Sequence, residues 1–173
     1  MVQLVSVASL LVLLAGCATC PVDPASTMIC DGTSPFEALS EDAVVPVVFG
    51  AQGGFHLLLA TRAHDIAPGS SSLERGYARD DLPVVTWDVH SPDERLTAEQ
   101  PRRVVAERSD NGWVLGPHTV VLHYFESPPA AFDPIERQNE LETLPITLSV
   151  EVEDACGNVA TDEIDVSIDF PLP

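Results

Sequence analysis

Lysine is absent from this sequence, and its eight basic residues are all arginine. The chain carries 27 Asp and Glu residues, so its formal net charge is −19. A chain this acidic has no basic stripe to neutralise phosphates, and we therefore expect no nucleic-acid partner. Its 173 residues are enough for one ordinary domain.

Motifs of known catalytic chemistry are absent as well. The sequence has no G-x-S-x-G nucleophile elbow, no H-E-x-x-H zinc motif, no dinucleotide-binding glycine fingerprint and no cysteine beside a histidine. We therefore expect that the protein is not an enzyme. A hydrolytic enzyme is the alternative, and it would need a deep pocket with converging polar groups.

An apolar run long enough to span a bilayer, about 20 residues, is also missing. The longest run, residues 4–14 (LVSVASLLVLL), has the length of a secretory signal core. It ends in LAGC at residues 14–17, which resembles the lipobox of bacterial lipoproteins. This resemblance implies cleavage before Cys17 and a diacyl lipid on its thiol. The first three residues carry no positive charge, unlike those of most signal peptides.

The lipobox resemblance divides the chain into a signal peptide over residues 1–16, a lipidated tether over 17–35 and a domain over 36–173. Proline, glycine and serine without periodicity favour the tether. No Asp follows Cys17, which implies anchoring at the outer membrane of a bacterial envelope. The alternative is an ordinary signal peptide, cleaved near Ala18, that releases a soluble secreted or periplasmic protein.

Three further cysteines follow Cys17, and export would bring them into an oxidising compartment where disulfides form by default. A bridge from the start of the domain to its last hairpin would close a long loop and remove on the order of 4 to 5 kcal/mol of unfolded-state entropy. We predict that Cys30 pairs with Cys156, with Cys20 as the alternative partner of Cys156. A Cys20–Cys30 bridge would close only a small local loop.

Apolar and polar side chains alternate along much of the domain, which predicts β-strands with one buried face. The alternation is found in five segments: 55–62, 85–90, 113–124, 146–153 and 163–170. Turn residues separate them, so we predict an all-β fold, a single antiparallel β-sandwich of about seven strands. Residues 134–144 form either an inter-strand loop or a short helix.

Two resemblances extend this prediction. Residues 149–168 (SVEVEDACGNVATDEIDVSI) resemble the closing hairpin of bacterial immunoglobulin-like domains, and Trp87 resembles their core tryptophan. An immunoglobulin-like sandwich is thereby implied, although no cysteines flank Trp87 to form the antibody-type inter-sheet disulfide. Residues 36–39, 50–56 and 62–63 resemble uncharacterised surface lipoproteins of myxobacteria, which implies the same fold and location.

The glycine-rich segment before the strand at 55–62 is a candidate ligand loop. Adjacent glycines allow positive φ angles or a close approach of another chain. The candidate residues are Gln52, Gly53, Gly54 and His56, and the alternative is a tight turn between two strands. His56 and His90 are both predicted to point outward, and they would meet if their strands paired.

The acidic last hairpin is the candidate cation site. If Ile164 lay opposite Val150, Glu151 would face Glu163, and Ca²⁺ could relieve this like-charge repulsion with hard oxygen ligands. The candidate calcium ligands are Glu151, Asp154, Asn158, Asp162 and Glu163. The alternative is a solvated acidic face without a metal.

These features together indicate a membrane-anchored, non-catalytic binding or structural module for adhesion or envelope assembly. Its expected partners are the membrane, through the N-terminal lipid, and an envelope or cell-surface protein or a glycan. An accessory subunit of an envelope complex and a calcium-dependent binding module are the alternatives. Apart from calcium, no cofactor is expected.

Overall fold

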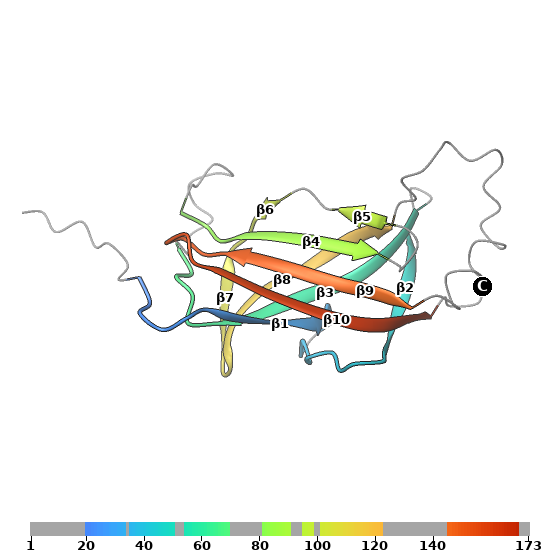
Figure 1. Ribbon diagram of the computed structural model, residues 1–173, viewed down its shortest axis with the longest axis horizontal. Helices are drawn as coiled ribbons and strands as arrows, with labels where there is room; N and C mark the ends of the chain where they lie inside the picture. Colours follow the sequence, from blue (N-terminus) through green and yellow to red (C-terminus); the bar gives the residue numbers. More distant parts are fainter. Residues whose placement is uncertain are drawn as a thin grey trace, which may run out of the picture.

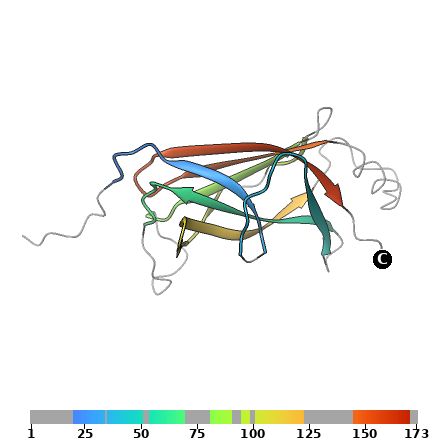
Figure 2. The same cartoon turned by 90° about the horizontal axis from the view of Figure 1, so that it is seen from below.

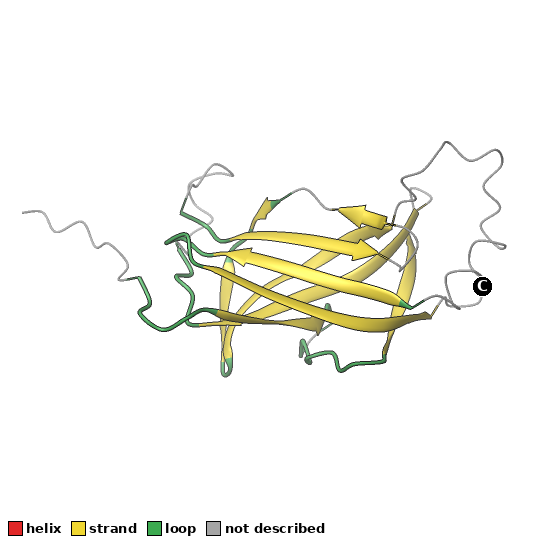
Figure 3. Cartoon of the chain, in the orientation of Figure 1, coloured by secondary structure: helices red, strands yellow, loops and turns green. Residues whose placement is uncertain are grey.

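The computed structural model describes residues 20–33, 35–50, 54–69, 81–90, 95–98, 101–122 and 145–169. These residues form strands and loops without a helix (Figure 3). In this part of the chain, no helix is long and apolar enough to cross a membrane. The predicted signal peptide, the lipid site Cys17 and the predicted loop or helix at 134–144 lie outside the described residues.

The described residues form ten strands that belong to one curled, mixed sheet (Figure 1). They are β1 (Ser26–Asp31), β2 (Ala43–Gly50), β3 (Gly54–His64), β4 (Val84–His90), β5 (Arg95–Ala98), β6 (Arg102–Arg103), β7 (Ala106–Ser109), β8 (Gly112–Leu122), β9 (Ile146–Glu153) and β10 (Val159–Asp169). Their order is β5-β4-β9-β10-β2-β3-β8-β7, and β1 and β6 are added on β3 and β4. The all-β prediction is confirmed. The strands outnumber the seven expected because β5, β6 and β7 are too short to show a periodicity.

The curl places β4, β9 and β10 in one layer and β3 and β8 in another, as Figure 2 shows from below. The two layers are in contact through the rings of Trp87 on β4 and His118 on β8, whose centroids are 6.1 Å apart. Both side chains are buried. The core therefore lies between the two layers that this single curled sheet forms.

Strand β2 joins the two layers, and its pairing differs from the antiparallel pairing that we predicted. Its first half pairs with the end of β10 in parallel, with Ala43 opposite Val166, whereas its second half pairs antiparallel with β3. The prediction of a wholly antiparallel sheet is thus wrong at this pair. Alternation shows which face of a strand is buried, but it does not show the direction of the neighbouring strand.

Strand β1 (Ser26–Asp31) lies within residues 17–35, which we predicted to be a tether, so the second half of that prediction is wrong. This segment pairs antiparallel with β3 along the same edge that β2 uses. The adjacent Ile29 and Cys30 are both buried, so the segment lacks the alternation that marks a strand in the sequence. The backbone N–H of Ile29 donates to Asp162 Oδ2 at 2.7 Å and thereby links β1 to β10.

The faces predicted for the last two strands are confirmed. In β9, Ile146, Leu148, Val150 and Val152 are at most 2% exposed, and the residues between them are half-buried or exposed. In β10, Val166 and Ile168 are buried. Since β9 lies between β4 and β10, its inward side chains form the centre of their layer.

Truncating a central valine tests this assignment. Val152→Ala removes buried methyl groups and leaves a cavity, so we expect the free energy of unfolding to fall by about 2 kcal/mol or more. The matched control is Val44→Ala, because Val44 is 62% exposed. Urea unfolding measures both. A loss as large for Val44→Ala as for Val152→Ala would contradict the assignment of the buried face.

Candidate functional site

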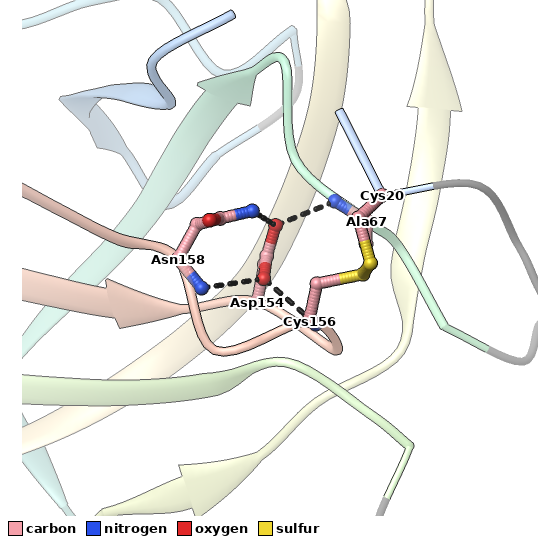
Figure 4. The surroundings of a disulfide bond; sticks show 5 residues. All are labelled: Cys20, Ala67, Asp154, Cys156 and Asn158. Carbon is pink, nitrogen blue, oxygen red and sulfur yellow. Dashed lines mark hydrogen bonds between the residues drawn. A yellow bond between two sulfur atoms is a disulfide. The ribbon is translucent and has the colours of Figure 1, made fainter. Parts of the chain in front are cut away.

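The carboxylate of Asp154 organises the turn between β9 and β10. Its Oδ1 accepts the backbone N–H groups of Cys156 at 2.8 Å and Asn158 at 2.9 Å. Its Oδ2 accepts the N–H of Ala67 at 2.8 Å and the Asn158 side-chain amide at 3.0 Å (Figure 4). Asp154 is only 4% exposed. Both oxygens are therefore engaged by donors of the protein itself.

Two opposing effects act on the pKa of Asp154. Burial raises it, whereas the hydrogen bonds from Ala67, Asn158 and Cys156 lower it, and their sum leaves the pKa below its ordinary value. Asp154 thus stays ionised at neutral pH. Its bond to Ala67 joins the turn to the segment after β3, and a second bond, from the N–H of Ala155 to the carbonyl of Ala67, reinforces that joint.

A disulfide between Cys20 and Cys156 lies beside this carboxylate (Figure 4). It joins the first described residue to the β9–β10 turn, and the favoured Cys30–Cys156 pairing is wrong. Its alternative, Cys20, is the partner of Cys156. We call this end of the molecule, formed by residues 20–22 and 154–159, the disulfide end.

The error over Cys30 has a structural reason. Cys30 lies within β1 opposite Ala60 of β3, and β1 extends from Ser26 away from the disulfide end. Its thiol is free and buried, and this burial raises its pKa. Cys30 is therefore a core residue and not a partner of Cys156.

The register of β9 and β10 differs from the one assumed for a cation site. Ile164 lies opposite Leu148, and not opposite Val150. As a result Glu151 faces Thr161, Glu163 faces Ser149, and the predicted direct Glu151–Glu163 pair is wrong. The two glutamates are diagonal neighbours on the outward face, where repulsion is weaker than between directly opposed charges.

The remaining calcium candidates lie elsewhere. Asp162 bonds to Ile29 between β10 and β1, whereas Asp154 and Asn158 bond to each other within the turn. The structure thus separates the five candidates into three places. No group of three or more His, Cys, Asp or Glu side chains suited to a metal is found in the described part of the chain.

A groove of about 500 Å³ lies over β4, β9 and β10. Two neighbouring cross-strand rows line it, the first being Thr86, Glu151 and Thr161 and the second Asp88, Ser149 and Glu163. Hydroxyl and carboxylate groups accept hydrogen bonds, so this groove suits ligands that present hydroxyl or amino groups. The alternation in the sequence predicted that these side chains point outward. It did not predict the groove, because the pairing of β4 with β9 joins segments that are far apart in the chain.

The predicted ligand loop is described only in part. Gln52 and Gly53 lie outside the described residues, whereas Gly54 opens β3 opposite Gly50. The segment links β2 to β3, which pair antiparallel. His56 on β3 and His90 on β4 lie on strands that do not pair, so the condition for these two histidines to meet is not fulfilled.

No protein-family model matches the chain, and no similar sequence is found among curated proteins.

Removing the Asp154 carboxylate tests its structural role. Asp154→Ala leaves three backbone N–H groups and one amide without their acceptor, and we expect a loss of about 3 kcal/mol in unfolding free energy at neutral pH. Asp23→Ala is the control, because Asp23 is exposed. An equal loss in both variants would show that Asp154 has no special role.

The same pair of proteins has a predictable pH dependence. A lowered folded-state pKa stabilises the fold above the unfolded pKa of about 3.9, and this contribution disappears as the pH falls through the folded pKa. The stability difference between the wild type and Asp154→Ala should therefore shrink below pH 4, approximately. Urea unfolding at several pH values measures it, and a difference independent of pH would contradict the lowered pKa.

The disulfide spans 136 residues. In the chain-entropy model, removing a disulfide that closes a loop of this size lowers the free energy of unfolding by about 5 kcal/mol. We expect the double variant Cys20→Ser/Cys156→Ser to melt well below the wild type and to be insensitive to dithiothreitol. Cys30→Ala is the matched control and should keep the sensitivity to this reductant. Loss of that sensitivity in Cys30→Ala would mean that Cys30 forms the bridge.

Proposed function

We propose that this chain is an exported, lipid-anchored binding or structural module of a bacterial envelope, with no catalytic activity of its own. The observation that carries this proposal is the Cys20–Cys156 disulfide. Disulfides persist in oxidising compartments outside the cytosol. The disulfide begins three residues after Cys17, the cysteine of the lipobox-like LAGC.

The fold that we propose for this module is an immunoglobulin-like sandwich. The neighbour order β3-β8-β7 in one layer and β4-β9-β10 in the other supports it, because immunoglobulin domains arrange their equivalent strands in this way. The buried Trp87 on β4 also supports it, since such domains place a core tryptophan on the corresponding strand. In contrast to antibody domains, the disulfide found here joins the segment before β1 to the β9–β10 turn, and it does not link two strands across the core.

The groove over β4, β9 and β10 is the binding surface that we propose. Its hydroxyl and carboxylate groups support recognition of a glycan or of a protein surface rich in amino and hydroxyl groups. Adhesion and envelope assembly both require such recognition outside the cytosol, and neither requires a reaction. The outer membrane is the proposed location, since no Asp follows Cys17.

Lipid attachment is tested by expressing the full chain in a bacterium with labelled palmitate. We expect label on the wild type, none on Cys17→Ser, and an intact mass that corresponds to a chain starting at a diacylated Cys17. Cys30→Ala should be labelled like the wild type. An unlabelled wild-type protein whose N-terminus lies downstream of Cys17 would overturn the proposed anchoring.

A further inference from the structure

We propose that the disulfide end of the domain rests on the membrane surface, and that the Cys20–Cys156 bond fixes this orientation. The inference depends on the proposed lipid at Cys17 and goes further, because it assigns the membrane-facing surface of the folded domain. The lipid surface is the partner that this end fits. Chain length leads to this surface, and the exposed valines and the charges near it are compatible with contact with a neutral lipid surface.

The length of free chain gives the first argument. From Cys17 to Cys20 there are three residues, which span at most about 11 Å when fully extended. The disulfide then ties Cys20 directly to the β9–β10 turn. Without it, the next point of attachment is Ala25, which packs against the core eight residues after Cys17, at a reach of about 28 Å. The disulfide thus shortens the tether to less than half.

The size of the domain limits which part of it this short tether can hold at the membrane. Strand β10 starts at the disulfide end with Val159 and extends over 11 residues, which corresponds to about 36 Å. The β2–β3 hairpin lies at the opposite end of the molecule (Figure 1). A tether of about 11 Å keeps the disulfide end at the bilayer, so the domain cannot contact the membrane with its opposite end alone while Cys20 stays attached to the turn.

Exposed apolar side chains give the second argument. Val22 is 100% exposed and lies two residues after Cys20, and Val159 is 53% exposed and lies three residues after Cys156. Both valines belong to the disulfide end, and the other two large apolar side chains exposed in the described part of the chain, Val44 and Val48, lie on β2. Apolar side chains at a membrane interface are removed from water, which is favourable in proportion to the area that they bury.

Charge gives the third argument. The cross-strand row nearest to the turn consists of Arg103, Val84, Glu153 and Val159, so this row has no net charge. The turn itself carries the charge of the Asp154 carboxylate, which is buried and accepts four hydrogen bonds. The two rows beyond this neutral row contain the carboxylates of the groove, Glu151 in the first and Asp88 and Glu163 in the second. The acidic groove is therefore displaced from the membrane along the strands. Asp23, exposed beside Val22, makes neutral lipids the favoured surface.

The test measures the distance of two positions from the lipid headgroups. Val159→Trp and Val48→Trp form a matched pair, because Val159 and Val48 are 53% and 50% exposed and Val48 lies near the β2–β3 hairpin. The full-length, lipidated variants are reconstituted in phosphatidylcholine vesicles that contain a headgroup-nitroxide lipid, and quenching of tryptophan fluorescence is recorded. The parent protein provides the background from its own tryptophans.

We expect quenching above the background for Val159→Trp and no increase for Val48→Trp. Two further changes, each introduced into Val159→Trp, should abolish most of this quenching. One is the removal of both bridging cysteines, Cys20→Ser/Cys156→Ser. The other is a Gly/Ser spacer of about eight residues between Ala18 and Thr19, which lengthens the tether while the disulfide and the fold stay intact.

The outcomes separate the orientation from the anchoring. Equal quenching of the two tryptophan variants in protein that floats with the vesicles would overturn the orientation and leave the lipid anchor standing. Undiminished quenching of Val159→Trp after insertion of the spacer would show that the disulfide does not set the orientation. A wild-type protein that carries no lipid and does not float would instead refute the proposed function.

Discussion

The ionised carboxylate of Asp154 is the group on which the disulfide end depends. It holds the turn between β9 and β10 in shape through the N–H groups of Cys156 and Asn158, and it holds the turn against Ala67 in the segment after β3. Cys156 is presented to Cys20 from this turn. A polar group that is buried and fully hydrogen-bonded specifies one local geometry, because every alternative leaves donors unpaired. The position of the disulfide follows from that geometry.

Closure of the curled sheet depends on a second contact between an acidic side chain and the backbone, which is half-buried, and on one strand that changes layers. Asp162 accepts the N–H of Ile29 and connects β10 to β1 where no ladder joins them. Further along, β2 pairs with β10 and then with β3. The segment from Cys20 to Asp31 is thus attached to the rest of the domain by the disulfide, by Asp162 and by pairing with β3. A segment attached in this way belongs to the fold.

The sequence predicted the faces of the strands much better than their neighbours. Ile146, Leu148, Val150 and Val152 are buried as expected, because the alternation along β9 reports the local environment of each side chain. Register, strand direction and cysteine pairing are properties of segments far apart in the chain. The Glu151–Glu163 register was wrong by two residues, since the turn anchored by Asp154 sets it and the alternation does not.

The choice of Cys30 failed for a related reason. Loop entropy alone cannot distinguish two cysteines that would both close long loops with Cys156. Placement decides between them, and β1 carries Cys30 into the core. The groove was recognisable only in part, because its outward residues are visible in the alternation of β4 and β9 whereas their adjacency requires the strand order.

If the proposed lipid is present on Cys17, the disulfide keeps one end of the domain close to the membrane, whereas a long flexible tether would let the domain rotate freely. Its groove and its far hairpin would then be held at a defined distance from the lipid. Peptide mapping by mass spectrometry under non-reducing conditions tests the linkage of Cys20 to Cys156, on which this arrangement depends. We expect one linked peptide pair that contains Cys20 and Cys156, together with a free Cys30. A linked pair that contains Cys30 and Cys156 would contradict it.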